Sequence, residues 1–254
     1  MSKVLILGDI HGRIHWRDII SKENPDKVIF LGDYVSTHEG IPADQQCSNL
    51  EDILNYKEEN PNKVVLLRGN HDNQHLGYSW AECYGYDKQV GRYMSSSEVK
   101  ERFLKLTQWI YIDNDLKTIF SHAGISEIWL KKFAEPVVID KIGSQYDDGS
   151  IDLEILLDHI NDLEPSEIFG FTPNNYFDMY GTSKTQPPTW IRPETLCMCN
   201  VIGWDQVVGH TPVRKISKMV QNTKGKQTIW LCDSLGDYNY LVIEDGEFIP
   251  KSLH

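Results

Sequence analysis

The stretches LILGDIHG (residues 5–12), IFLGDYVS (residues 29–36) and LLRGNHD (residues 66–72) decide the expected fold. In each of them an apolar run stops at a glycine, sometimes with one polar residue between, and a polar cluster follows. A short apolar run that ends in this way is typical of a buried strand rather than of a helix. We therefore predict strands at 3–7, 27–31 and 63–67, each with polar side chains at its carboxyl end.

The segments between these runs indicate how the strands are connected. Polar, helix-compatible sequence follows the first run, and residues 51–59 suit a helix before the third. Alternation of strand and helix predicts an α/β fold built from right-handed β-α-β units with parallel strands. Ligands of such sheets bind outside the carboxyl ends of the strands, so the polar clusters should converge on one crevice. Further strands are expected at 116–121, 205–209, 228–232 and 240–243.

Composition limits the classes of protein that the chain can represent. It has 254 residues, of which 40% are hydrophobic and 24% charged, which is typical of a globular protein and excludes general disorder. A net charge of −12 argues against a broad nucleic-acid-binding surface. We expect no membrane segment, because no apolar run approaches the roughly 18 residues that are needed.

The domain organisation and the compartment are also predicted. We expect residues 1–254 to form a single domain with a cap or insertion at about 140–190, lying over the crevice. An acidic helix is expected there at 151–163. The five cysteines form no zinc-clip spacing and suit free thiols in a reducing cytosol, so a cytoplasmic location is predicted.

The residues expected at the strand ends share one kind of chemistry. They supply carboxylate, imidazole and amide groups without a thiolate, a set that suits Mn²⁺, Fe²⁺ or Zn²⁺. A lone carboxylate can bridge two such ions, and two ions about 3.5 to 4 Å apart can clamp a phosphoryl group. These residues are Asp9, His11, Asp33, Asn70, His71, His122 and His210.

Five blocks of the sequence, in this order, resemble the calcineurin-like metallophosphoesterase superfamily. The resemblance implies a β-sandwich flanked by helices, with a dinuclear metal site at the carboxyl ends of its strands. It spans residues 8–212, which is most of the chain. The blocks are Gly8-Asp9-Ile10-His11-Gly12, Gly32-Asp33-Tyr34, Gly69-Asn70-His71-Asp72, Ser121-His122-Ala123-Gly124 and Gly209-His210-Thr211-Pro212.

The resemblance also implies a role for each matching residue. Two divalent ions are implied, with Mn²⁺ favoured and Fe²⁺ or Zn²⁺ as alternatives. Asp33 would bridge the ions, and His71 would protonate the leaving oxygen. The first ion would be held by Asp9, His11 and Asp33, and the second by Asp33, Asn70, His122 and His210.

The last block distinguishes two branches of the superfamily. Many phosphodiesterases carry a second histidine where this chain has Pro212, so that ligand is absent. The chain instead resembles the phosphoprotein phosphatases and their bacterial and phage relatives, which include diadenosine tetraphosphate hydrolases. Two further blocks match that branch too: Leu67-Arg68-Gly69-Asn70-His71 and Trp190-Ile191-Arg192-Pro193. These matches imply that Arg68 and Arg192 hold phosphate oxygens, with Asn70 also near the substrate, as guanidinium chemistry would allow.

One block departs from the phosphatase pattern Gly-Asp-x-Val-Asp-Arg-Gly. Ser36 replaces the aspartate that orients the catalytic histidine, and Thr37 replaces an arginine that contacts phosphate. His71 therefore lacks its usual partner, for which Glu39 and Asp72 are candidates. Arg13 is expected at the surface or at the rim of the substrate site.

We predict a phosphatase that hydrolyses phosphate monoesters, serine/threonine phosphatase-like, through a metal-bridging hydroxide. Its partner would be a phosphorylated substrate: a phosphoprotein, a nucleotide or a small phosphoester. A phosphodiesterase or a nucleotide or diadenosine polyphosphate hydrolase is the alternative within the same site. A metal-binding scaffold of weak or no activity is the alternative from another class.

Overall fold

Two five-stranded sheets form the centre of the computed structural model, which describes residues 3–78, 83–163, 178–221 and 226–254. The first sheet has the strand order β10-β9-β1-β2-β3, and the second has the order β4-β5-β6-β8-β7. The strands of the first sheet are β1 (Lys3–Leu7), β2 (Lys27–Phe30), β3 (Val64–Leu66), β9 (Asn239–Glu244) and β10 (Glu247–Ser252). Those of the second are β4 (Ile110–Asp113), β5 (Thr118–Ser121), β6 (Asp205–Val208), β7 (Ser217–Gln221) and β8 (Gln227–Leu231).

Parallel pairing brings the carboxyl ends of six predicted strands to one edge of their sheets, whereas the seventh, β9, runs antiparallel to β1. Strands β1, β2 and β3 pair in parallel, and so do β5, β6 and β8. All seven strands that the sequence predicts are present. The three strands that it does not predict, β4, β7 and β10, lie at sheet edges, where one side of the backbone has no neighbouring strand and the apolar pattern is weaker.

Alternate residues of the central strands face two different cores. Ile6, Ile29 and Val65 join a cluster with Val207 and Trp230 of the second sheet, which fills the space between the sheets. The residues on either side of them along the strands, such as Leu5 and Phe30, face the helices instead. This is the period of two of a β-strand, and it confirms the predicted sandwich. The inter-sheet core supports our proposal that residues 1–254 form one domain.

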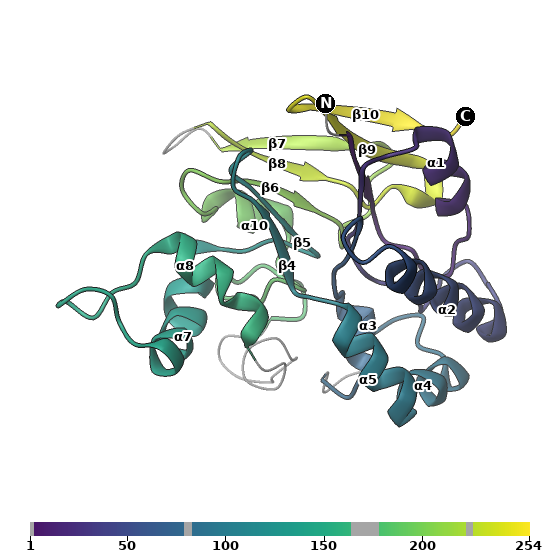
Figure 1. Ribbon diagram of the computed structural model, residues 1–254, viewed down its shortest axis with the longest axis horizontal. Coiled ribbons are helices and arrows are strands. Elements are labelled where there is room, and N and C mark those ends of the chain that lie inside the picture. The colour runs from purple at the N-terminus through teal and green to yellow at the C-terminus, as the bar shows by residue number, and fades with distance from the viewer. Residues whose placement is uncertain (1–2, 79–82, 164–177, 222–225) are drawn as a thin grey trace.

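Helices cover the outer faces of the sandwich (Figure 1). In that view α1, α2, α4 and α5 lie on the right, and α7 and α8 on the left. The predicted helix at 51–59 is the second half of a longer helix, α2. The helices are α1 (Trp16–Glu23), α2 (Ala43–Glu59), α3 (Asn70–His75), α4 (Lys88–Met94), α5 (Ser97–Leu106), α6 (Glu127–Trp129), α7 (Glu135–Ile142), α8 (Leu153–Asp158) and α10 (Pro193–Met198). A π-helical turn (Leu130–Ala134) and 3₁₀ turns at Ile160–Asp162 and Leu235–Asp237 complete the described elements.

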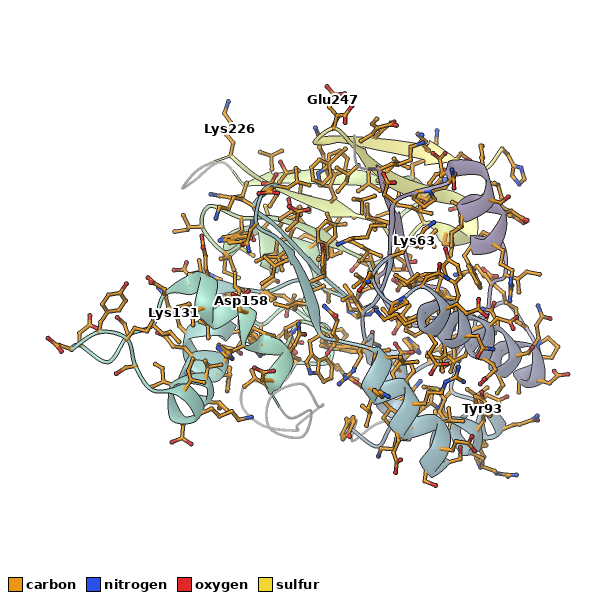
Figure 2. The ribbon with its side chains drawn as sticks, in the orientation of Figure 1. Lys63, Tyr93, Lys131, Asp158, Lys226 and Glu247 are labelled. Atoms are coloured by element: carbon orange, nitrogen blue, oxygen red, sulfur yellow. The ribbon has the colours of Figure 1, made fainter. Side chains whose placement is uncertain are left out.

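Side chains fill the space around the sheets, whereas Lys226 and Glu247 point away from them (Figure 2). No helix among the described residues is long and apolar enough to cross a membrane.

Residues 151–163 of the predicted cap at about 140–190 pack beside the second sheet. Within it the expected helix at 151–163 is divided into α8 and a 3₁₀ turn. Leu156 and Leu157 of α8 join a cluster with Trp109 and Trp129 rather than lining the crevice. Residues 164–177 lie outside the described residues, so the prediction that this segment covers the crevice remains a prediction.

Candidate metal centre

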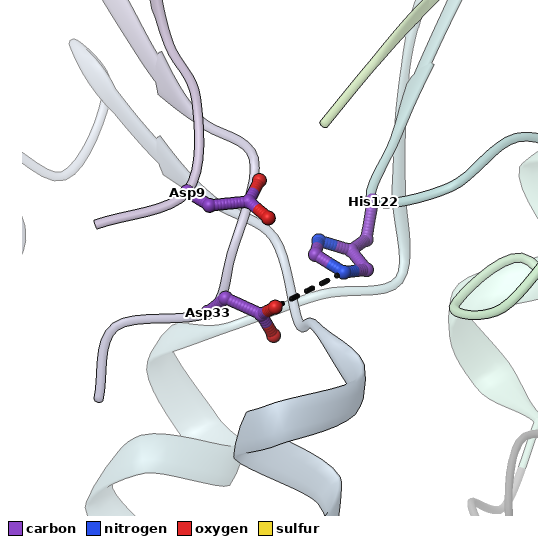
Figure 3. A group of neighbouring side chains, drawn as sticks. All are labelled: Asp9, Asp33 and His122. Carbon is purple, nitrogen blue, oxygen red and sulfur yellow. Dashed lines mark ion pairs between the residues drawn. The ribbon is translucent and has the colours of Figure 1, made fainter. Parts of the chain in front are cut away.

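The predicted ligands come from separate loops at the carboxyl ends of the strands. Asp9 and His11 follow β1, Asp33 follows β2, and Asn70 begins α3 after β3. His122 directly follows β5, and His210 comes two residues after β6. Figure 3 shows Asp9, Asp33 and His122 pointing from three segments toward one space. One ligand atom from each of these three lies within 4.8 Å of the others.

Asp33 lies between two histidines. Its Oδ2 is 3.4 Å from His122 Nε2 and 3.9 Å from His11 Nε2. His11 Nε2 is also 3.9 Å from Asp9 Oδ2. A carboxylate with imidazoles on both sides is suitably placed to bind two cations at once.

Asn70 lies between the other pair of histidines. Its Oδ1 is 2.9 Å from His122 Nε2 and 2.9 Å from His210 Nδ1. Its amide nitrogen faces the Cys83 sulfur at 3.5 Å, so the oxygen is the atom that faces the imidazoles.

The far nitrogen of each histidine determines where its proton lies. His11 Nδ1, His122 Nδ1 and His210 Nε2 lie 3.1, 2.8 and 3.2 Å from the backbone carbonyls of Val35, Leu31 and Trp190. A carbonyl oxygen only accepts, so each of these nitrogens must donate a hydrogen. The other nitrogen of each neutral ring then has a lone pair aimed at Asp or Asn oxygens. This carbonyl contact is the arrangement that usually orients metal-binding histidines.

Burial keeps the imidazoles neutral and disfavours the charged carboxylates. Burial lowers the pKa of His122 to about 3 and that of His11 to about 4. The pKa of His210 is lowered by burial and by His122. Burial, and to a smaller extent the charge of neighbouring carboxylates, raises the pKa of Asp9 and of Asp33 well above the usual range. Without a cation these lone pairs and oxygens face one another unfavourably, so the site fits divalent metal ions.

Strained backbone and glycine contacts hold this arrangement. His11, Asp33 and His210 have φ angles of +46°, +50° and +63°, in the left-handed region that side chains rarely adopt. A Cβ on Gly69 would lie 2.0 Å from Asp33 Oδ1, and one on Gly209 would lie 2.2 Å from Asp9 Oδ1. Only glycine at these two positions leaves room for the carboxylates.

Replacing Gly69 with alanine is expected to weaken metal binding about tenfold or more, because the new methyl group displaces the Asp33 carboxylate. Competition between the protein and a fluorescent chelator measures the affinity. Gly203→Ala is the control. Its φ of +84° strains an alanine there, but no atom lies within 4 Å of the added Cβ, so the variant introduces strain without a collision. Equal affinity of Gly69→Ala and wild type would contradict the assigned geometry.

Five of the six predicted ligands, Asp9, His11, Asp33, Asn70 and His210, line a cavity of about 510 Å³, whereas His122 is fully buried and does not line it. His71 and Arg192, the predicted proton donor and phosphate ligand, also line it. His71 donates its backbone N–H to Asp33 Oδ1 at 2.9 Å. Arg192 Nη1 donates to His210 O and Thr211 Oγ1 at 3.2 and 3.1 Å, so this half-buried guanidinium is fixed beside a predicted ligand.

Arg68, which the sequence predicts to hold phosphate oxygens, is not among the residues that line this cavity. Its Nε donates to Thr107 Oγ1 at 2.7 Å, and its Nη2 donates to the carbonyls of Leu104 and Thr107. The guanidinium also packs over the Trp109 ring at 4.6 Å. These contacts direct the side chain toward α5, which a motif match alone does not reveal.

Neither candidate partner of His71 orients it. Asp72 accepts the backbone N–H groups of Asp33, Tyr34 and Gly69. Glu39 forms an ion pair with Arg13 at 2.7 Å. Both acidic groups are therefore engaged elsewhere.

Further charged residues line the cavity, among them Arg13 and Asp233. Arg13 reaches it from the loop after β1, with Nη1 donating to the Asp9 carbonyl at 3.0 Å. Asp233, two residues after β8, lies there as well. Burial is the main cause of the raised pKa of Asp9, and the charge of Asp233 is the next largest. The sequence signal for Asp233 is the one that marked Asp9 and Asp33, an acid just past a buried strand.

Comparisons with known proteins identify the family of the chain. The model of the family described as calcineurin-like phosphoesterase matches residues 2–214. Over 136 residues the chain is 34% identical to the serine/threonine-protein phosphatase 4 catalytic subunit of Kluyveromyces lactis, covering 49% of this chain and 40% of that protein. Over 98 residues it is 32% identical to serine/threonine-protein phosphatase 7 of Arabidopsis thaliana, covering 35% and 21%. The chain thus spans less than half the length of these curated relatives.

Solved structures of phosphatases share the fold. A cold-active protein-tyrosine phosphatase of a Shewanella species superimposes with a TM-score of 0.56 at 16% identity, covering 100% of this chain and 78% of that one. A Saccharomyces cerevisiae serine/threonine phosphatase superimposes with a TM-score of 0.54 at 16% identity, covering 99% and 79%. At this identity the likeness shows the fold alone.

Proposed function

This chain belongs to the calcineurin-like phosphoesterase family, and we propose that it is a metal-dependent phosphatase that hydrolyses phosphate monoesters. The observation that carries the proposal is the set of three buried imidazoles, each donating its far N–H to a backbone carbonyl and aiming its lone pair at Asp or Asn oxygens. The curated relatives that match are serine/threonine phosphatases, which supports the same reaction class.

Two divalent ions are the cofactors that this site would hold. Asp9, His11 and Asp33 would bind the first, and Asp33 would also bind the second. Asn70, His122 and His210 would complete the second set of ligands. Bound there, the ions would polarise the phosphoryl oxygens and make water a stronger nucleophile. We propose Mn²⁺ as the metal, because the donors are nitrogen and oxygen without thiolate.

The remaining residues would position the substrate and handle the proton. Arg192, fixed beside His210, would pair with phosphate oxygens, because a guanidinium fork matches their geometry and charge. His71, on the wall of the same cavity, would donate a proton to the leaving oxygen. We also propose a cytoplasmic location, which the five free cysteines support.

A substrate panel tests the reaction class. The purified protein is loaded in turn with Mn²⁺, Zn²⁺ and Fe²⁺ and assayed on a phosphoserine peptide, bis-(p-nitrophenyl) phosphate, a 2′,3′-cyclic nucleotide and diadenosine tetraphosphate. We expect the phosphomonoester to be hydrolysed fastest. Faster turnover of a diester or of the dinucleotide would favour the alternative enzyme class. No turnover with any metal would favour a metal-binding scaffold.

Two arginine variants should affect different properties: Arg192→Met mainly the catalytic efficiency, and Arg68→Met mainly the stability of the fold. Arg192→Met is expected to lower kcat/KM about a hundredfold, because it removes a charge from the transition state. It should cost less stability than Arg68→Met, because the Arg192 guanidinium is only half-buried. Arg68→Met is expected to lower the free energy of unfolding by about 3 kcal/mol, because it leaves buried carbonyls unpaired. Steady-state kinetics and urea unfolding of both variants check this. A large kinetic loss for Arg68→Met with full stability would restore the predicted clamp role.

A further inference from the structure

His71 contacts a neutral amide where the family pattern has a carboxylate. Gln74 lies one turn further along α3, and its Nε2 is 3.4 Å from His71 Nδ1. The same Nε2 donates to Ser36 Oγ at 3.0 Å. Ser36 occupies the position at which the family pattern has the aspartate, so the amide and the hydroxyl together fill its place.

The orientation of this amide is determined by a backbone donor. Gln74 Oε1 accepts the N–H of Cys83 at 2.6 Å, and a backbone nitrogen can only donate. The Nε2 end of the amide must therefore face Ser36 and His71. Because Nε2 is also only a donor, His71 Nδ1 must accept, and the proton of the neutral ring is on His71 Nε2.

A second set of contacts fixes Ser36. The Ser36 hydroxyl oxygen accepts a hydrogen bond from Gln74, so the hydroxyl hydrogen is free to be donated to His75 Nε2 at 2.7 Å. Its backbone has a φ of +67°, and its N–H is held by Gln46 Oε1 at 2.8 Å. The His75 ring in turn stacks on Tyr86 with 4.9 Å between ring centroids. Since Ser36, Gln74 and His75 are all buried, water competes little for these contacts.

We propose that Gln74, supported by Ser36, is a positioning residue that holds His71 in one ring orientation and as the Nε2–H tautomer. A carboxylate partner would do the opposite, since it accepts from Nδ1–H. The consequence for turnover rests on the proposed phosphatase function, whereas the tautomer does not. This narrows the proposed proton donation by His71 to hydrogen-bond donation, because a neutral ring that gave up its only N–H would be left as an imidazolate. In turnover, the Nε2–H of His71 would stabilise the leaving oxygen through a hydrogen bond.

Nitrogen-15 NMR of histidine-labelled protein tests the tautomer without any activity. The Zn²⁺-loaded protein is used, and His71→Gln identifies the signal of His71. We expect the Nε2–H pattern in wild type and a shift to the Nδ1–H pattern in Gln74→Glu, whose carboxylate can only accept from Nδ1–H. The proposal is overturned if wild type has the Nδ1–H pattern, or if Gln74→Glu leaves the pattern unchanged.

A double-mutant cycle tests the role in turnover. Gln74→Met keeps the length of the side chain but removes the donor. We expect it to lower kcat about tenfold for phenyl phosphate, a poor leaving group, and less for p-nitrophenyl phosphate, a good one. In the His71→Gln background the same change should have no further effect. The neighbouring buried residue of α3 supplies the control, Asn73→Ala.

The outcomes separate the two proposals. Equal losses on both substrates, or additive losses in the His71→Gln background, would mean that Gln74 is only structural and would overturn the positioning role. If wild type hydrolyses neither substrate with any metal, the proposed phosphatase function fails. The NMR pattern then still decides whether Gln74 sets the tautomer of His71.

Discussion

Asp33→Asn is expected to reduce kcat by about a thousandfold while leaving the fold intact. The change removes the carboxylate that would bridge the two ions, and metal ions contribute several kcal/mol of charge stabilisation, at about 1.4 kcal/mol for each factor of ten. Asparagine retains the oxygen that accepts the His71 backbone N–H. Steady-state kinetics with Mn²⁺ and metal analysis of the purified variant measure the two effects.

The same variant has an expected signature in the metal-free protein. Burial raises the pKa of Asp33, which means that its charge is unfavourable when no cation is present. Metal-free Asp33→Asn should therefore melt at or above the temperature of the metal-free wild type. Asp205→Asn, a half-buried aspartate at the start of β6, is the control and should retain full turnover. Near-wild-type turnover of Asp33→Asn would show that the site is wrongly assigned.

Metal removal is expected to abolish turnover and to lower the melting temperature. A ligand at a hundredfold excess over its dissociation constant stabilises the folded state by about 2.7 kcal/mol. For a chain of this size that corresponds to a shift of about 5 to 10 °C. The protein is stripped with a chelator, dialysed, and titrated with Mn²⁺, Zn²⁺ or Fe²⁺ while melting and activity are followed together.

The control for this titration is the Asp33→Asn variant, which should gain little stability from added metal. Melting curves measure binding even if no substrate has been found, so they separate loss of the metal site from a wrong choice of substrate. A wild-type melting temperature that does not change up to millimolar metal would mean that the converging lone pairs do not bind cations.

Much of the fold followed from local pattern. Apolar runs that end near glycine predicted the central strands, because a buried strand needs a short continuous apolar stretch. The edge strand β10, with the sequence EFIPKS, escaped prediction because only one side of it pairs and its side chains are partly exposed. The boundaries of α2 were also wrong, since its first half, ADQQCSNL, is polar and is held by packing rather than by propensity.

The sequence by itself predicted an α/β fold with polar side chains gathered at one edge, because parallel strands place their carboxyl ends together. The sandwich followed from the resemblance of its motifs to the metallophosphoesterases. Only the tertiary structure decided where each side chain points. Arg68 turns toward α5 because the carbonyls of Leu104 and Thr107 accept its hydrogens. Gln74 faces His71 because the N–H of Cys83 holds the other end of its amide. Such contacts join residues from different loops, and hydrogen bonds that depend on three-dimensional proximity leave no periodic pattern along the chain.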